Sequence, residues 1–538
     1  MSRLENAAVA ERLESFAALL DLAGASFYTA RAYRRAAELI RATPAPIAEL
    51  VLAGRARELR GIGPGIEARL VELVETGDIA ELRELERTVA PELVGLGRYL
   101  GLSAKRAVEI GQALGVETAE EFRAAMWAGR LRSVPGIGPR TEQRLLEALE
   151  REGEARPRRG LLLNRARRLL GDIAEAVGGE VAGDPRRWRD TSERLVIVSI
   201  DNNALDRFVN LEQIVAVVER TAERAVGVTV EGVPVELLAV PTERFGTELL
   251  RATGSEAYVR ALEPLPAGAS EEEVYAQLGV AWCPPELREE PHRREPPPLL
   301  ELADIRGDLH CHTTWSDGKA TVLEMAESAR ERGYEYLAIC DHTPSVGAVQ
   351  GLTADEVRRQ GDEIAEANER LAPFRVLRGI ECDIRRDGTL DLPDELLAEL
   401  DWVMASVHAG QRAPREEITK RVTDAMRNPH VHAISHPKGR LINHRPENAL
   451  DLDEAFAVAL ETGTALEVNG LPDRLDLRGE HVRRAIEAGV EIVVSTDAHS
   501  TTGLGNMELA VATTRRGWAT AADVVNTRPL SKILLRGL

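Results

Sequence analysis

The spacing of hydrophobic residues changes twice along the chain. Apolar side chains first recur at helical intervals, in short segments separated by glycine clusters. Valine-rich runs typical of strands then follow a helical pattern. Beyond a proline-rich stretch, short apolar runs alternate with helical patterns to the end. The pattern predicts an all-α region at 1–150, an α+β region at 151–283, a semi-rigid linker at 284–303 and a β/α region at 304–538.

The C-terminal region has the most regular pattern. Seven predicted strands, most of them followed by a helix, cover 305–310, 336–341, 375–381, 402–408, 432–436, 463–469 and 491–497. Strands that alternate with helices form a parallel sheet, and the simplest closed form of this one is a barrel. Barrels of this kind carry their chemistry at the carboxyl ends of the strands.

Almost every predicted strand ends in an imidazole or a carboxylate. These residues are His310, His312, Asp317, Asp341, His342, Glu381, His408, His436, Asp497 and His499. Side chains alternate along a strand, so each His-x-His or Asp-x-His pair points to one side. Imidazole and carboxylate without thiolate suit zinc, manganese or iron. The set is too large for one tetrahedral ion, so we expect two or three divalent ions, Mn²⁺ or Zn²⁺, that activate water for phosphoester hydrolysis.

The alternative is that these histidines are ordinary core or surface residues. For one histidine alone, that alternative is at least as good as the metal hypothesis. For the whole set it is weak, because core packing gives no reason to place histidines at successive strand ends. We treat His430, His432, His444 and His481 as ordinary residues because they lack this placement.

Composition narrows the function classes. The formal net charge is −20, divided as 0 over residues 1–160, −8 over 161–300 and −12 over 301–538. A chain this acidic does not bind polyanions through bulk electrostatics, so DNA binding needs backbone amides, basic clusters or metal ions. No apolar run reaches the ~18 residues that cross a bilayer, and no secretory signal is evident. With four cysteines and no CxxC pair, we expect a cytoplasmic protein, associated with the nucleoid and monomeric by default.

The motifs of the C-terminal region resemble those of the PHP (polymerase and histidinol phosphatase) domain, a (β/α)7 barrel with a trinuclear metal site. They are DLHCHT, SDG, CDHT, GIECDI, SVHAG, SHP and STDAHS. The resemblance implies one metal held by His310, His312, Glu381 and Asp497, a second between Glu381, His408 and His436, and a third held by Asp317, His342 and His499. It also suggests that Asn469 and Arg474 contact the phosphate or nucleotide, although Arg474 would equally suit a surface ion pair.

Two glycine motifs in the N-terminal region form an internal repeat. GIGPG places Gly61, Gly63 and Gly65 before one predicted helix, and PGIGP places Gly136 and Gly138 before another. Glycines allow close approach of a phosphate to the amides of a helix N-terminus, without sequence readout. A simple helix-connecting turn is the alternative for a single copy. Two copies resemble helix-hairpin-helix motifs, whereas a weaker third copy at 100–114 is expected to be structural.

The α+β region resembles the palm of family X DNA polymerases, and the likeness spans almost the whole chain. The stretch AGDPRRWRDTSERLVIV (182–198) matches the family's turn with arginines, but the two aspartates that hold catalytic magnesium fall on Arg194 and Val196. The third carboxylate position falls on Glu236. Arginine and valine do not coordinate magnesium, so we expect a persisting fold, a nucleotidyltransferase-like palm remnant, without significant polymerisation.

These observations favour a metal-dependent phosphoesterase acting on DNA, a 3′–5′ exonuclease or 3′-end-processing enzyme in repair. Its expected partner is DNA as single strands, gaps or 3′ ends. One alternative is an active gap-filling family X polymerase with a proofreading PHP domain, which the missing aspartates oppose. A small-molecule phosphatase of the histidinol-phosphatase type is opposed by the glycine repeats, and a non-catalytic DNA-binding scaffold by the complete ligand set.

Overall fold

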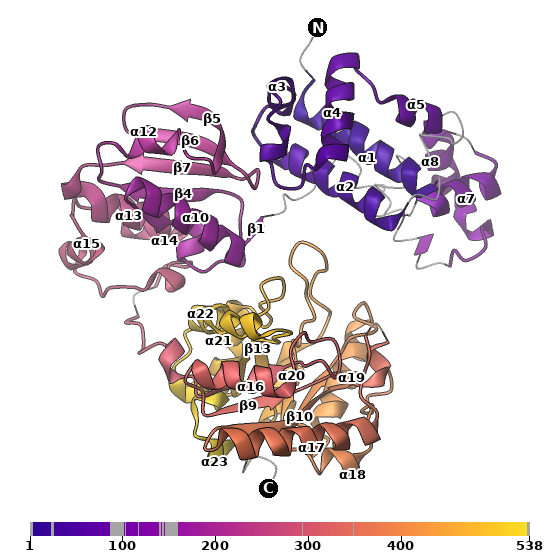
Figure 1. The fold of residues 1–538 in the computed structure, drawn as a ribbon, viewed down its shortest axis with the longest axis vertical. Helices are drawn as coiled ribbons and strands as arrows, with labels where there is room; N and C mark the ends of the chain where they lie inside the picture. The colour runs from indigo at the N-terminus through magenta and orange to yellow at the C-terminus, as the bar shows by residue number, and fades with distance from the viewer. Residues whose placement is uncertain are drawn as a thin grey trace. The chain divides into compact units, whose positions relative to one another are not determined.

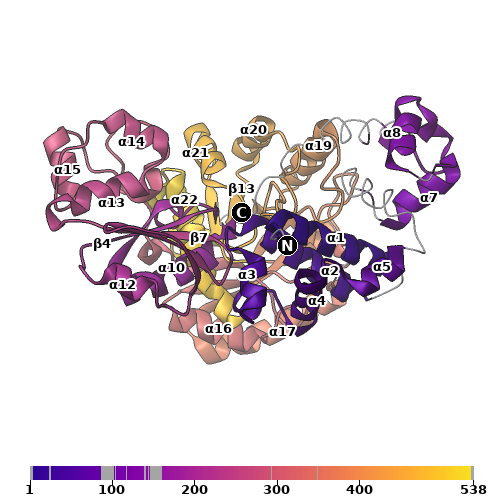
Figure 2. The same cartoon turned by 90° about the horizontal axis from the view of Figure 1, so that it is seen from above.

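The computed structural model describes residues 4–22, 26–86, 102, 104–116, 118–138, 141–142, 145, 160–292, 294–347 and 349–534. The chain divides into two compact units. One comprises residues 1–161, 173–179 and 193–239, and the other 162–172, 180–192 and 240–538. Figures 1 and 2 show the elements from two directions. Within the described residues, no helix is long and apolar enough to cross a membrane.

The N-terminal region is helical, as predicted. Its helices are α1 (Asn6–Leu22), α2 (Phe27–Ala42), α3 (Ile47–Leu52), α4 (Pro64–Thr76), α5 (Ala80–Glu86), α7 (Ala104–Leu114) and α8 (Ala119–Trp127). Gly63 caps α4 and Pro64 takes its first position, where a missing N–H costs nothing. Helices α1 to α5 share one hydrophobic core, and α7 and α8 contribute to a second. The helix expected after the second glycine motif lies mostly outside the described residues.

The α+β region contains a five-stranded mixed sheet. Its order is β2-β4-β7-β6-β5, where β2 is Gly179–Ala182, β4 is Leu195–Ser199, β5 is Ile214–Arg220, β6 is Arg224–Thr229 and β7 is Pro234–Ala239. Strands β1 (Leu161–Leu162) and β3 (Thr191–Ser192) form a separate pair. The associated helices are α10 (Leu163–Val177), α11 (Gly183–Arg186), α12 (Ala204–Phe208), α13 (Phe245–Thr253), α14 (Glu256–Leu262) and α15 (Glu271–Leu278).

Two details of this region differ from the sequence analysis. Strands β2 and β5 were not predicted, although β5 begins with five consecutive apolar residues, IVAVV; it is an edge strand that is mostly exposed beyond its first residues. Part of the expected linker is also packed. Leu287 and Arg288 are buried, and Leu287 joins a hydrophobic cluster with Tyr258 and Tyr275. Proline content alone therefore does not identify a solvated segment here, and the domain boundaries stay predictions.

The C-terminal region is a parallel seven-stranded sheet in sequential order. Its strands are β8 (Gly307–Cys311), β9 (Tyr336–Ile339), β10 (Arg375–Asp383), β11 (Trp402–Ser406), β12 (Ala433–Ile434), β13 (Ala465–Asn469) and β14 (Ile492–Ser495). A parallel bridge between Cys311 and Ala498 brings the two edges together, so the barrel is nearly closed. The predicted (β/α)7 architecture is confirmed.

Helices follow every barrel strand and supply the outer layer, as Figure 1 shows for α16 and α17. They are α16 (Val322–Glu331), α17 (Ala354–Leu371), α18 (Asp394–Leu397), α19 (Arg415–Met426), α20 (Leu452–Thr462), α21 (Gly479–Ala488) and α22 (Met507–Arg516), with a short α23 (Leu530–Ile533). Their starts are encoded locally. Thr321 and Glu324 form a capping box at α16, and Asp451 accepts backbone bonds at α20.

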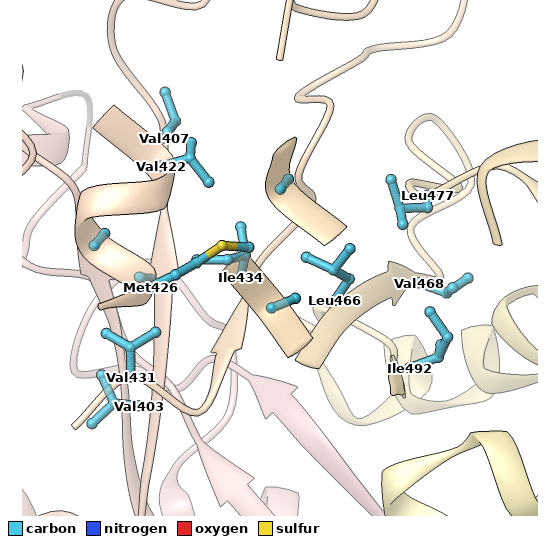
Figure 3. Packing of buried hydrophobic residues seen from close by; sticks show 14 of the residues in the cluster. Val403, Val407, Val422, Met426, Val431, Ile434, Leu466, Val468, Leu477 and Ile492 are labelled. Carbon is cyan, nitrogen blue, oxygen red and sulfur yellow. The ribbon is translucent and has the colours of Figure 1, made fainter. Parts of the chain in front are cut away.

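Two apolar layers hold the barrel and leave only one end polar. Outside, Met426 of α19 packs near Ile434 of β12, and Leu466 of β13 is paired with Ile492 of β14 in the sheet register (Figure 3). Inside, a second cluster fills the barrel toward the amino ends of the strands, with Leu309, Tyr336, Leu377, Trp402 and Met404 among its members. Polar side chains inside the barrel are thereby confined to the carboxyl ends of the strands.

Candidate metal centre

The structure brings all the sequence-predicted metal ligands to one end of the barrel. Each comes from the carboxyl end of a strand or the loop that follows it, and most are buried, the partly exposed ones being Asp317, His408 and His499. Because the strands are parallel, residues far apart in the chain meet on one rim. Their role as ligands remains a prediction, but their convergence is a structural fact.

The first group of donor atoms contains His310, His312 and Asp497. Nε2 of His312 lies 3.0 Å from Oδ1 of Asp497, and Nε2 of His310 lies 3.8 Å from the same oxygen. Glu381 joins this group, since its Oε2 is 3.6 Å from Nε2 of His310.

Glu381 lies at the centre of a second group. Its Oε2 is 2.9 Å from Nδ1 of His342, and its Oε1 is 3.0 Å from Nε2 of His436 and 3.6 Å from Nε2 of His408. Its two oxygens thus face different histidines. This arrangement fits the expectation, drawn from the PHP resemblance, that Glu381 takes part in holding two of the ions.

The third group contains His312, Asp317, His342 and His499. Oδ1 of Asp317 lies 3.3 Å from Nε2 of His499 and 3.6 Å from Nε2 of His342. His312 is therefore a candidate for two groups, which the sequence analysis did not anticipate. The imidazoles of His312 and His499 are stacked, with ring centroids 4.2 Å apart.

The protonation states of the cluster suit cations. Burial opposes ionisation of Glu381 and Asp497, but the surrounding histidines outweigh it and hold both pKa values well below the usual range. Burial, together with His342 and His499, lowers the pKa of His312 to about 3, so this imidazole is neutral. Oε2 of Glu381 and Nδ1 of His436 are buried without a hydrogen-bond partner among the described residues. Ionised carboxylates, a neutral imidazole and buried ligand atoms without a hydrogen-bond partner are suited to bind divalent ions.

A surrounding layer of carboxylates orients the histidines. Glu467 accepts a hydrogen bond from Nδ1 of His310 at 2.7 Å and from the backbone N–H of His436 at 2.6 Å. Asp383 accepts from Nδ1 of His408 at 3.2 Å. Such partners fix the tautomer and ring orientation of a ligating histidine. Neither carboxylate was predicted from the sequence, although Glu467 is two residues before Asn469 on the same strand and so shares its inward face.

Asp341 differs from the other strand-end residues. Its carboxylate accepts from the backbone N–H of Thr313 at 2.8 Å and from Nε2 of Gln360 at 2.6 Å. It therefore holds the loop after β8 rather than facing the cluster.

The two predicted substrate residues lie beside Asp497. Nδ2 of Asn469 donates to Oδ2 of Asp497 at 2.9 Å, so Asn469 orients this carboxylate. Nε of Arg474 is 3.7 Å from the same oxygen. Nε and Nη1 of Arg474 have no hydrogen-bond partner among the described residues. This arginine is suited to bind an oxyanion next to the metals.

The glycine motifs occupy turns with open surroundings. Gly61 and Gly136 have φ values of 106° and 81°, which side chains rarely adopt. A Cβ on Gly63, Gly65 or Gly138 would meet no atom within 4 Å among the described residues. Packing therefore does not explain why these last three positions are glycine. A ligand that approaches the backbone closely would explain it.

The polymerase-like positions form ion pairs. Val196 of β4 lies beside Glu236 of β7 in the sheet register. Glu236 accepts a hydrogen bond from Arg224, and its Oε2 is 3.5 Å from Nη1 of Arg194. Two guanidinium groups thus neutralise the remaining carboxylate.

Comparisons with known proteins agree with this layout. A helix-hairpin-helix domain model matches residues 4–79, a SAM-like helix-hairpin-helix tandem model matches 100–151, and a PHP domain model matches 308–470. The protein named DNA polymerase/3′-5′ exonuclease PolX from Bacillus subtilis (strain 168) is 34% identical over 558 residues, which cover 97% of each chain. The chain belongs to the PolX family. The predicted resemblance is confirmed over the whole length.

Other relatives of this PolX-family chain match the barrel alone. A probable phosphatase from Acetivibrio thermocellus is 33% identical over 211 residues, covering 37% of this chain and 82% of that protein. Another, from Thermoanaerobacter sp. (strain X514), is 29% identical over 232 residues, covering 41% and 89%. The barrel is thus the part shared with smaller proteins, and the PolX family adds the helical and α+β regions.

Proposed function

We propose that the chain is a metal-dependent phosphoesterase that removes nucleotides from, or processes, the 3′ ends of DNA, and that its polymerase core is catalytically silent. The observation that carries the nuclease proposal is the buried cluster of imidazoles and carboxylates around Glu381 and Asp497. The PolX relative, which is named for both activities, supports DNA as the substrate class.

The residues of the cluster have separate roles in this proposal. His310, His312, Glu381 and Asp497 would hold one ion, Glu381, His408 and His436 a second, and Asp317, His342 and His499 a third. Bound Mn²⁺ or Zn²⁺ would polarise the phosphoryl group and supply hydroxide near neutral pH. Asn469 orients Asp497 through its 2.9 Å hydrogen bond. Arg474, whose Nε and Nη1 have no hydrogen-bond partner among the described residues, binds the phosphate of the terminal nucleotide.

The proposal that the polymerase core is silent rests on the charges around its remaining carboxylate. Magnesium in a polymerase site is held by one or two ionised carboxylates together with the phosphates of the substrate. Here the remaining carboxylate, Glu236, is occupied by Arg224 and Arg194 and lies beside an apolar Val196. We infer that this region supports DNA handling rather than synthesis.

Both proposals are tested with one gapped duplex labelled at the 5′ end of its primer strand. Wild-type protein with Mn²⁺ is expected to shorten the primer from its 3′ end, and His310→Ala/His312→Ala protein to leave it intact. Adding dNTPs to that double variant is the sharper test of the core, because degradation no longer hides extension. Primer extension there would overturn the silent-core proposal, and equal shortening by both proteins would overturn the metal site.

A monoesterase that removes only a 3′-phosphate is the second candidate, because the barrel-only relatives are named probable phosphatases. A primer ending in a 3′-phosphate separates the two. Loss of phosphate without loss of nucleotides would favour this candidate.

A further inference from the structure

The loop 471–478, between β13 and α21, carries Arg474 and depends on a few contacts for its shape. The backbone N–H of Asn469 donates to the carbonyl of Asp476 at 2.7 Å. Leu475 has φ of 46°, in the left-handed region that costs a branched side chain free energy. A loop in such a conformation needs support from its surroundings.

Arg440 supplies that support. Its Nε donates to the backbone carbonyl of Arg474 at 2.7 Å, and its Nη2 donates to the carbonyl of Leu475. The side chain is 10% exposed. A buried guanidinium is costly without a counter-charge, so the carbonyl bonds alone do not stabilise it.

Asp190 provides the counter-charge from a distant part of the sequence. Its Oδ2 accepts from Nη1 of Arg440 at 2.7 Å, and its Oδ1 accepts from Nη1 of Arg516 at 2.9 Å. Burial opposes its ionisation, but Arg440 and Arg516 outweigh it and lower the pKa of Asp190. Asp190 belongs to the segment of the palm remnant that lies in the same compact unit as the barrel.

Apolar contacts accompany the ion pairs. Leu163 and Trp188 form a cluster with Leu475, Leu509 and Ile442. The guanidinium of Arg167 lies over the Trp188 ring, 3.4 Å from its centroid. The palm remnant therefore contacts loop 471–478 through packing and, by way of Arg440, through charge.

We propose that Asp190 is a positioning residue for 3′-end hydrolysis, which acts through Arg440 to hold Arg474 over the metal cluster. This gives the polymerase-like region a present use: it supports the nuclease loop. The inference rests on the proposed function, and on Arg474 as the phosphate-binding residue.

The first test compares Asp190→Asn with Glu286→Gln in the full-length protein. Glu286 is a suitable control because it is a carboxylate, 7% exposed, whose hydrogen bond goes to Arg515 of α22 and not to Arg440 or loop 471–478. We expect Asp190→Asn to lower kcat for primer shortening by about 10- to 100-fold, because small misplacements of a positioning group have effects of this size. Manganese content and the Tm change are expected to match those of Glu286→Gln.

A double-mutant cycle separates positioning from general damage. If Asp190 acts through Arg474, then Asp190→Asn has little further effect in an Arg474→Ala background. Rate losses that multiply, or an unchanged rate for Asp190→Asn alone, would overturn the proposal. If Asp190→Asn does not fold, Arg440→Lys keeps the charge but loses the forked donors, and is expected to show the same rate loss and the same non-additivity.

Hydrogen exchange gives a readout that does not need activity. Amides at 471–478 are expected to exchange faster in Asp190→Asn than in wild type and Glu286→Gln. Should wild-type protein fail to shorten DNA, the proposed function fails, while faster exchange would still support the contact between Asp190 and the loop. Unchanged exchange would overturn that contact.

Discussion

At the scale of single residues, the barrel shows how burial and charge produce a metal-binding site. The histidines would be expensive to bury alone, but each faces a carboxylate, and each carboxylate faces several histidines. The most consequential partner is Glu467, which is fully buried and contacts His310, the backbone of His436 and the hydroxyl of Ser495. Glu467 thus orients His310 and His436, which are candidate ligands of two different ions.

We therefore predict that Glu467→Gln lowers the affinity for Mn²⁺ by about 10- to 100-fold, because loss of an orienting carboxylate has effects of this size. Titration calorimetry with metal-free protein measures the change. Glu461→Gln, at an exposed position on α20, is the matched control and is expected to bind like wild type. Unchanged affinity in Glu467→Gln would mean that the histidines are oriented by packing alone.

At the scale of elements, buried ion pairs join pieces that the hydrophobic pattern does not connect. Glu271, the first residue of α15, accepts two hydrogen bonds of 2.8 Å from Arg186 of α11 and two from Arg288, the longer of them 3.2 Å. Arg288 is fully buried. These contacts fasten the turn that the sequence analysis assigned to a linker.

We predict that Glu271→Gln destabilises the protein by about 3–5 kcal/mol, since it leaves Arg288 buried without a full counter-charge. Urea unfolding followed by circular dichroism measures it. Burial opposes ionisation of Glu271, but Arg186 and Arg288 outweigh it and lower its pKa in the folded state. The contribution is therefore complete above the pKa of the unfolded chain, about 4.3, and is lost as the pH falls toward the folded value. A variant with the same acid sensitivity as wild type would contradict this account.

A second prediction at this scale concerns the first glycine motif. Gly65 lies in the first turn of α4 with open space around it. An aspartate there suits the helix dipole but repels phosphate. Gly65→Asp is thus expected to keep the Tm of wild type and to weaken binding to gapped DNA by about tenfold, and Gly65→Ala to bind more tightly than Gly65→Asp. Fluorescence anisotropy measures the two affinities. Equal affinity of both variants would mean that DNA does not bind at this glycine motif.

The elements also show which features were predictable from sequence. The barrel strands and the nine candidate ligands were, because a buried parallel strand has a continuous apolar run and a polar end. Strand β5 was missed although it carries the apolar run IVAVV; its position at a sheet edge, exposed beyond its first residues, comes only from the fold. Asp383 and Glu467 were missed for another reason: a residue that orients a ligand has no spacing of its own, and only the fold brings Glu467 to His310.

At the scale of the whole molecule, the difficulty is how a chain of net charge −20 holds DNA. In the proposed function, the open glycine turns, the partly buried Arg474 and the cluster of candidate metal ligands bind DNA locally despite the overall charge. In that proposal each would contact few phosphates. Binding should therefore depend little on counterion release, which scales with the number of phosphates neutralised by cations.

We predict a shallow salt dependence. Anisotropy titrations of His310→Ala/His312→Ala protein on gapped DNA, between about 50 and 200 mM salt, are expected to give a slope of log K against log salt smaller in magnitude than about 4, because each neutralised phosphate contributes about 0.9. Using the double variant keeps the DNA intact during the measurement. A slope of about 6 or more would contradict this picture, since it requires a basic surface that neutralises many phosphates. The Gly65→Asp change, which removes no cation, should weaken binding without making the slope shallower, so the amide contacts and the cationic contacts are measured separately in one molecule.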